Sequence, residues 1–211
     1  MNSLYGELTM HFEFLVEEES AETALYNLVP KIVGPAVSYN IRVFQGKFDL
    51  LKKLPERLRG YRHWLPDDWL IIVLLDRDRE DCLQLKAKME EIARREGLST
   101  KSNPNPSGKI QVLNRIAIEE LEAWFFGDVT ALKTAYPRIP KALDKKSRYR
   151  NPDAIDGTWE ALEWVLQRAG YYRGGLPKKE AARKISTYMD PARNTSKSFQ
   201  VFRDSLYDIA T

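Results

Sequence analysis

Residues 69–78, WLIIVLLDRD, contain a continuous apolar run over 69–75 that is followed by two aspartates, Asp76 and Asp78. An uninterrupted run of this length is typical of a strand that is buried on both faces of a sheet. A second run, residues 11–16 (HFEFLV), ends in Glu17, Glu18 and Glu19. Helix-type patterns separate the strand-like segments, which predicts right-handed crossovers and a mostly parallel α/β sheet flanked by helices. We therefore expect both acidic clusters at the carboxyl edge of that sheet, where open α/β sheets bind ligands.

Apolar spacing and turn residues place the other elements. In the first half we expect a strand at 39–45, a short strand at 109–113, and helices over 20–33, 47–62 and 79–96. Ser20 is the expected N-cap of the first of these helices. The second half is mainly helical, with helices expected over 116–128, 158–170, 175–189 and 196–210. This change of character predicts a sheet domain over residues 1–128 that carries the acidic site, and a mostly helical region over 129–211 that packs on it.

Composition restricts the class of protein. The chain has 211 residues, of which 43% are hydrophobic and 30% are charged, as in an ordinary soluble globular protein. Its single cysteine, Cys82, excludes an intrachain disulfide framework and favours a reducing, cytoplasmic location. The sequence has no long apolar span or signal-peptide pattern, so no membrane association is expected. Only His11 and His63 are present, which argues against a zinc site and against histidine catalysis.

The acidic clusters have the chemistry of a hard-cation site. Asp76 and Asp78, two residues apart at a strand end, can turn both carboxylates toward one ion, and Mg²⁺, with Mn²⁺ as a substitute, prefers such oxygen ligands. Glu18 and Glu22 lie four residues apart and share one helix face if the helix begins early. The alternatives are N-capping by Asp76 or Asp78 and a solvated turn for the glutamates.

The charge distribution suggests a partner of opposite sign. The net charge is only +3, but residues 1–30 are acidic and residues 133–203 are rich in lysine and arginine. An acidic metal edge beside a basic region suits a phosphate-bearing polymer such as DNA or RNA, whereas the alternative is a solvated surface. Lys47 at the end of a strand-like run and Lys197 in the segment NTSKSF are further candidate phosphate contacts.

These segments together resemble a known family. The chain is similar to a bacterial family catalogued as domain of unknown function 4276. The segments that carry this similarity are LVEEESAETAL, FQGKFDLLKKLPERLRGY, VLLDRDREDCLQLK, NRIAIEELEAWFFGD, AYPRIP, GGLPKKEAARKI and NTSKSFQVFRD. A strand-terminal glutamate, a helix and a later strand ending in Asp-X-Asp also resemble the Toprim domain of topoisomerases, primases and OLD-type nucleases, over roughly the first 125 residues. Toprim proteins usually follow their glutamate with glycine, so Glu17 and Glu18 both stay open, and we prefer Glu18.

The resemblance implies roles for these residues. Glu18, Asp76 and Asp78 would be catalytic, and the metal ligands would be Glu18, Glu22, Asp76, Asp78 and a further acid from Glu119, Glu120 or Glu122, assigned here to Glu120. Lys47, Arg115, Lys178, Lys179 and Lys197 would contact nucleic acid. The implied activity is that of a Mg²⁺-dependent nuclease with an ATPase partner protein in phage defence, and an oligomer is compatible with it. The alternative is a non-catalytic module that binds metal or nucleic acid as the partner of an ATPase.

Overall fold

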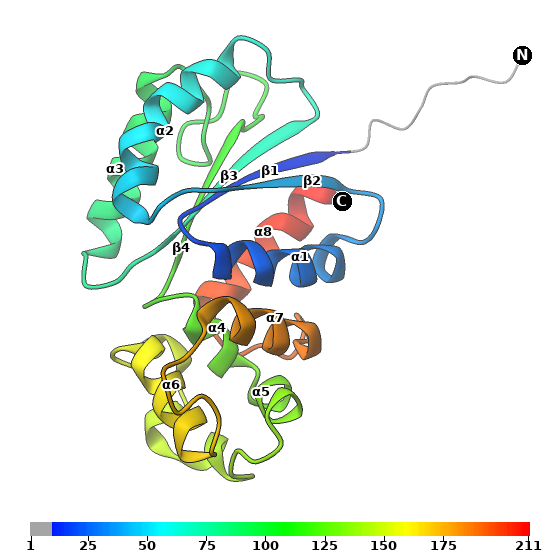
Figure 1. Cartoon of the computed structure of the whole chain (residues 1–211). Helices are drawn as coiled ribbons and strands as arrows, with labels where there is room; N and C mark the ends of the chain where they lie inside the picture. The colour runs from blue at the N-terminus through cyan, green and yellow to red at the C-terminus, as the bar shows by residue number, and fades with distance from the viewer. Residues whose placement is uncertain (1–9) are drawn as a thin grey trace, which may run out of the picture.

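A parallel four-stranded sheet forms the centre of the protein, with strand order β2-β1-β3-β4 (Figure 1). A computed structural model of the chain describes residues 10–211. The strands are β1 (His11–Val16), β2 (Ser38–Val43), β3 (Trp69–Asp76) and β4 (Val112–Ala117). The expected α/β class with a parallel sheet is therefore confirmed.

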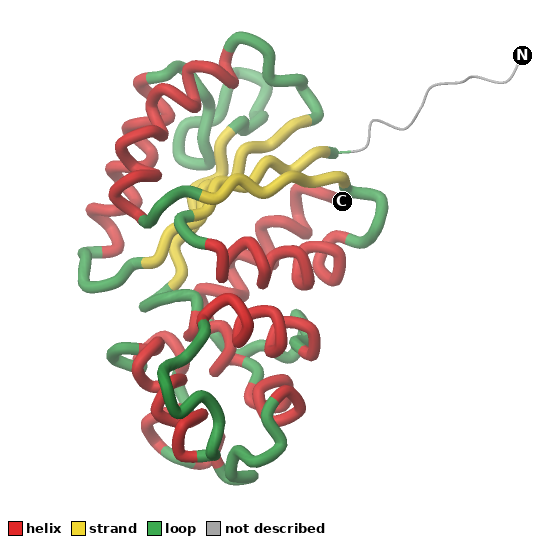
Figure 2. The backbone as a smooth tube through the Cα atoms, in the orientation of Figure 1, coloured by secondary structure: helices red, strands yellow, loops and turns green. Residues whose placement is uncertain are grey.

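Helices cover both faces of the sheet and form the lower part of the molecule in Figure 2. They are α1 (Glu19–Val33), α2 (Lys47–Arg62), α3 (Cys82–Arg95), α4 (Glu122–Gly127), α5 (Val129–Ala135), α6 (Thr158–Arg168), α7 (Lys178–Tyr188) and α8 (Lys197–Ala210). Short 3₁₀ turns are η1 (Leu143–Lys145), η2 (Ser147–Tyr149) and η3 (Pro152–Ala154). Within residues 10–211, no helix has the length and apolar character needed to cross a bilayer.

Alternation along the strands produces two hydrophobic cores. Phe12, Phe14 and Val16 of β1 face one core, to which α1, α4 and α8 contribute. Leu15 and the odd-numbered apolar residues of β3 face the other core, against α2 and α3. Because alternate positions face opposite layers, Asp76 at the end of β3 falls on the α1 side of the sheet.

The helical region after residue 128 is continuous with the first core. The ring of Phe202 on α8 lies 6.3 Å from that of Phe14 on β1. Lys31 of α1 donates to three carbonyl oxygens at the end of α7, including that of Thr187 at 2.7 Å. A cation there neutralises the negative end of the helix dipole. Helices α7 and α8 thus complete the layer that α1 begins.

Several expected boundaries need correction. The strand expected at 109–113 lies at Val112–Ala117, and the helix expected from residue 116 begins at Glu122. Asp81, not Asp76 or Asp78, caps α3, since its side chain accepts the Gln84 N–H. The helix expected from Ser20 begins at Glu19 with Glu18 as N-cap.

Candidate metal centre at the carboxyl edge of the sheet

Strands β1 and β3 are parallel neighbours, and their register brings the two acidic clusters together. Val16 pairs with Leu74, so Glu18 and Asp76 each lie two residues beyond this last pair. Helix α4 follows β4 at the same edge, because β4 is the parallel neighbour of β3. The expectation that both clusters share one sheet edge is therefore confirmed.

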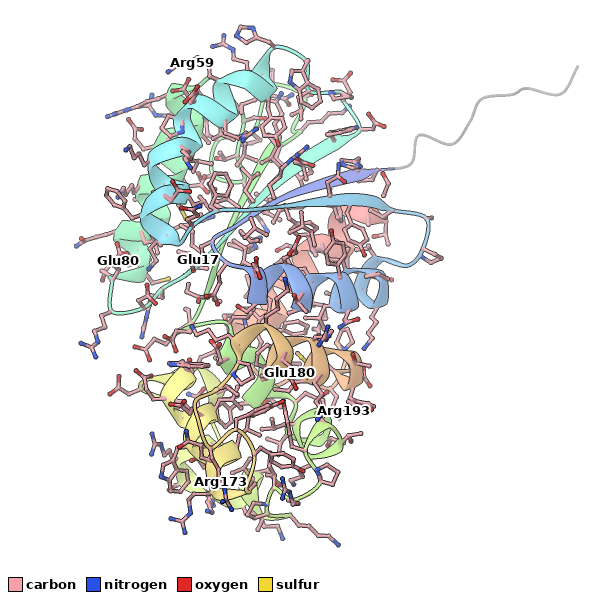
Figure 3. The ribbon with its side chains drawn as sticks, in the orientation of Figure 1. Glu17, Arg59, Glu80, Arg173, Glu180 and Arg193 are labelled. Atoms are coloured by element: carbon pink, nitrogen blue, oxygen red, sulfur yellow. The ribbon has the colours of Figure 1, made fainter. Side chains whose placement is uncertain are left out.

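Glu17 occupies the inner part of this edge. Its side chain is buried, and its Oε1 accepts the backbone N–H of Asp76 at 2.6 Å. Burial raises the pKa of Glu17 to about 7, although the Asp76 N–H and the nearby Lys47 oppose the shift. Figure 3 shows Glu17 at the turn between β1 and α1.

The charges of the other acids raise the pKa of Asp76. Burial is the first cause that raises its pKa well above the ordinary value, followed by the charges of Glu17 and Glu122. The charges of Glu18 and Asp78 raise this pKa further. The four charges that act on Asp76 therefore all come from acids at this edge of the sheet.

Glu122 adds a buried acid from α4. Its side chain is 1% exposed, and its Oε2 has no hydrogen-bond partner among residues 10–211. Burial raises the pKa of Glu122 to about 7, while the charge of Lys178 lowers it. An ionised carboxylate in this position needs a positive partner, because a buried charge without one is costly.

Glu119 and Glu120 are engaged differently from Glu122. The Oε2 of Glu120 accepts the Thr158 hydroxyl and the Trp159 N–H, both at 2.8 Å, where α6 begins. Glu119 accepts the Gly157 N–H at 2.8 Å. Both acids therefore hold the start of α6, and the assignment of Glu120 to a metal stays a prediction.

Asp78 adopts a left-handed backbone conformation, with φ of 51°. Aspartate tolerates this region better than most residues. Its carboxylate binds the Nζ of Lys47 at 2.6 Å, and Lys47 also contacts Glu80 at 3.1 Å. The ammonium group of Lys47 thus supplies positive charge to acids that follow β3.

The first turn of α1 carries the remaining acids. The hydroxyl of Ser20 donates to Glu18, whose other oxygen lies 3.8 Å from the Nζ of Lys178. Glu19 binds Lys179 at 2.8 Å, and the charge of Glu22 raises the pKa of Lys179 together with Glu19. Helix α7 therefore brings two lysines to the start of α1.

The expected basic residues are divided between two places. Lys47, Lys178 and Lys179 contact acids at the sheet edge. Arg115 and Lys197 instead line a depression between α3 and α8. Only the first group is in contact with the acidic cluster.

The donor set fits a hard divalent cation, although its side chains do not form a finished shell. Among residues 10–211, no three His, Cys, Asp or Glu side chains are arranged to hold a metal ion. Glu17 and Asp78 are turned to donors of the protein instead, Glu17 to the Asp76 N–H and Asp78 to Lys47. The unpartnered Oε2 of Glu122 and the raised pKa of Asp76 both indicate a shortage of positive charge there.

An acidic depression of about 400 Å³ opens beside this cluster. Its walls include Asp78, Glu80, Glu119, Glu120, Asp156 and Glu160. Glu80 lies toward the α3 side of the molecule in Figure 3. A phosphate chain that approaches from this side would meet like charge, unless cations come with it.

The sequence did not single out Glu17 and Glu122 as buried acids of the site. The buried strand provides a signal for Glu17, because Glu17 continues β1, which is buried at all six positions, by one residue. Glu122 lies in the run ELEAWFFG, whose apolar residues are all buried in the structure. An acid within such an apolar run is a signal of a functional carboxylate.

The fold and this edge define a class of protein, an α/β protein with a buried carboxylate cluster at the carboxyl ends of parallel strands. A family model described as "Domain of unknown function (DUF4276)" matches residues 16–207. The chain belongs to this family, as its sequence resemblance indicates. Comparisons with curated proteins and with solved structures found no significant match.

Proposed function

We propose that the protein is a Mg²⁺-dependent nuclease of the Toprim-like type that hydrolyses phosphodiester bonds in DNA or RNA, with Mn²⁺ as an effective substitute. The observation that carries the proposal is the cluster around Asp76. Four other acids raise its pKa, and one of them, Glu122, has a buried oxygen without a partner. A divalent cation is the ligand that compensates such a group of charges.

In this proposal, Asp76, Asp78, Glu17 and Glu122 are the residues that would hold the cation. A bound Mg²⁺ supplies Lewis acidity that polarises a phosphoryl oxygen. Glu18 is more exposed than Glu17, with a side chain 32% accessible, so it can accept a proton from an attacking water. Lys178 contacts Glu18 and favours an anionic substrate beside it.

Lys47 has a second role in the proposal. Its Nζ lies 2.6 Å from Asp78 and donates to the backbone oxygen of Arg77 at 3.1 Å. A cation held by Asp78 would compete with Lys47 for that carboxylate, and Lys47 would then be able to contact a phosphate of the substrate. Lys179, which is exposed on α7, would contact a further phosphate along the same nucleic-acid strand.

The second candidate is a non-catalytic module that binds metal or nucleic acid as the partner of an ATPase. It is favoured by the engagement of Glu17, Asp78 and Glu120 with protein donors, which suits a structural role. The ATPase partner, a role in phage defence and a cytoplasmic location follow from the family resemblance and from the single cysteine. Both candidates use the same acidic edge, so cleavage separates them.

The test is a cleavage assay with plasmid DNA, single-stranded DNA and structured RNA, each with Mg²⁺, Mn²⁺ or EDTA. We expect metal-dependent cleavage by the wild type and a loss of at least about a hundredfold in Asp76→Asn, because charge at the metal is removed. Asp49→Asn, a change at an aspartate that pairs with Lys53 on α2, is the matched control. Metal and nucleic-acid binding without cleavage under any condition would favour the second candidate.

A further inference from the structure

A groove of about 260 Å³ lies between α3 and α8, at the free edge of β4. Its lining is mostly apolar and includes Leu83 and Val201, which are 80% and 45% exposed. Exposed aliphatic side chains on both walls of one groove are characteristic of a contact surface rather than of isolated surface positions. We call this feature the α3–α8 groove.

Arg115 lies in the wall of this groove without a direct ion pair to any of residues 10–211; burial lowers its pKa, and the charge of Glu90 opposes this. Its side chain is 8% exposed. It donates to the backbone oxygen of Asn114 at 2.8 Å and to the hydroxyl of Ser205, while its Nε has no acceptor. Buried guanidinium groups are normally paired directly with an anion, so a carboxylate of a ligand in the groove would complete the surroundings of Arg115.

Two further cations surround the groove. Lys197, the first residue of α8, is exposed and forms no ion pair within residues 10–211. Lys86 of α3 binds Glu90 at 2.8 Å and donates to the Asn114 oxygen at 2.7 Å. Asp153 also lines the groove, but its carboxylate accepts the Ser196 hydroxyl and the Ser198 N–H. The groove thus combines aliphatic walls with two cations that have no direct ion pair within the described residues, Arg115 and Lys197, and a complementary ligand combines apolar groups with a carboxylate.

We propose that the α3–α8 groove docks a protein partner through a segment in which an aspartate or glutamate is flanked by aliphatic residues. The acid would reach Arg115 and Lys197, and its neighbours would cover Leu83 and Val201. A small carboxylic acid in the groove would leave Leu83 in water, whereas a protein surface covers it. A second copy of this chain is disfavoured, because a twofold contact would bring the same cations together.

Nucleic acid is the competing occupant of the groove. Phosphates would pair with Arg115 and Lys197, but backbone phosphates make no favourable contact with the aliphatic walls. The proposal is independent of the nuclease proposal, since it concerns a different set of residues. Binding measurements at the groove therefore test it without any assay of cleavage.

Cys82 provides a specific reporter, because it is the single cysteine of the chain and lines the groove. The rate at which iodoacetamide alkylates Cys82 is measured by mass spectrometry in the full-length protein. The probes are the peptide GSLVEVLGS and its counterparts in which the central glutamate is replaced by glutamine or lysine. A short oligothymidylate is the nucleic-acid probe.

We expect the glutamate peptide to protect Cys82 with an affinity about tenfold or more above that of the glutamine peptide, as a charge-assisted bond provides. Arg115→Met should remove this preference. Leu83→Ser, a change at an exposed position that does not threaten folding, should weaken the binding of all three peptides. Lys52→Met, which removes an exposed cation from α2, should change nothing.

Three results would overturn the proposal. The first is equal protection by the glutamate and glutamine peptides, and the second is protection that persists in both Arg115→Met and Leu83→Ser. The third is stronger protection by oligothymidylate than by any peptide, which would assign the groove to nucleic acid. Absence of protection by every probe at millimolar concentration also counts against it.

Discussion

The backbone N–H of Asp76 donates to the carboxylate of Glu17 at 2.6 Å, and this bond joins the ends of two neighbouring parallel strands. It holds the Glu17 oxygen toward Asp76, whose pKa the other acids raise. The bond also explains how a buried glutamate is retained without a paired cation, since an N–H partly satisfies its charge. Glu17 is therefore central to the site, and Glu18 lies at its more exposed side.

This relationship separates the effects of the two glutamates. Glu17→Gln keeps an acceptor for the Asp76 N–H but removes a buried charge that is repelled by its neighbours. The metal-free variant should be more stable than the wild type at pH 8, by about 1–3 kcal/mol. Glu18→Gln, at a half-buried side chain, should change stability by less than about 0.5 kcal/mol. Urea denaturation in EDTA measures both, and equal effects of the two changes would contradict the central position of Glu17.

The stability of the metal-free protein should fall as the pH rises through 7. The pKa values of Glu17 and Glu122 are both about 7 in the folded chain, above the ordinary value of 4.5. The folded state therefore holds these protons more tightly than the unfolded state does, so their contribution is complete below pH 4.5 and is lost as the pH passes 7.

Thermal denaturation between pH 5 and 8.5, in EDTA and in Mg²⁺, measures this dependence. We expect the melting temperature to fall with pH in EDTA and to fall less in Mg²⁺, because the cation competes with the protons. Glu122→Gln should flatten the EDTA curve, whereas Glu56→Gln, an exposed position on α2, should not. A melting temperature that rises toward pH 8.5 in EDTA would be inconsistent with acids held protonated in the fold.

Lys47 should compete with a bound cation. Its Nζ contacts Asp78 and Glu80, so Lys47→Met leaves these acids with less positive charge nearby. We expect the affinity for Mn²⁺ to rise by about threefold to tenfold and the affinity for nucleic acid to fall. Titration calorimetry and fluorescence anisotropy measure the two affinities. A loss of Mn²⁺ affinity would show that Lys47 supports the site instead of competing for it.

Glu120 should matter for stability more than for the metal. Its Oε2 accepts the hydroxyl of Thr158, which is fully buried, and the Trp159 N–H at the start of α6. Glu120→Ala should therefore cost about 1–2 kcal/mol of unfolding free energy, as the loss of a helix cap does. The Mn²⁺ affinity of the folded variant should stay within about twofold of the wild type. A much larger loss of affinity would return Glu120 to the metal ligands.

The sequence predicted those parts of the fold that depend on local pattern. The run at 69–76 and the helix over 47–62 have unbroken apolar or helical spacing, and both were correct within a residue. The strand at Val112–Ala117 was misplaced, because its residues Asn114 and Arg115 are polar but buried. Their burial depends on contacts with Glu90 and Ser205 from distant helices, which periodicity does not report.

The candidate site was predictable in position but not in detail. Two strand-terminal acidic clusters indicated a common edge, and parallel pairing of β1 with β3 confirms it. The sequence could not decide that Glu17 turns toward Asp76, since this depends on which way the chain leaves β1. Nor could it decide that Glu120 holds α6, because Thr158 lies 38 positions further along the chain.

The most direct test of the account is a calorimetric titration of the metal-free protein with Mn²⁺ at pH 8. The matched variants are Asp76→Asn, at the centre of the cluster, and Asp49→Asn on α2. The account predicts saturable binding to the wild type and to Asp49→Asn, and an affinity at least about tenfold lower in Asp76→Asn, because the central ligand charge is lost. Equal affinity in all three proteins, or no binding to the wild type, would contradict a metal centre at this edge of the sheet.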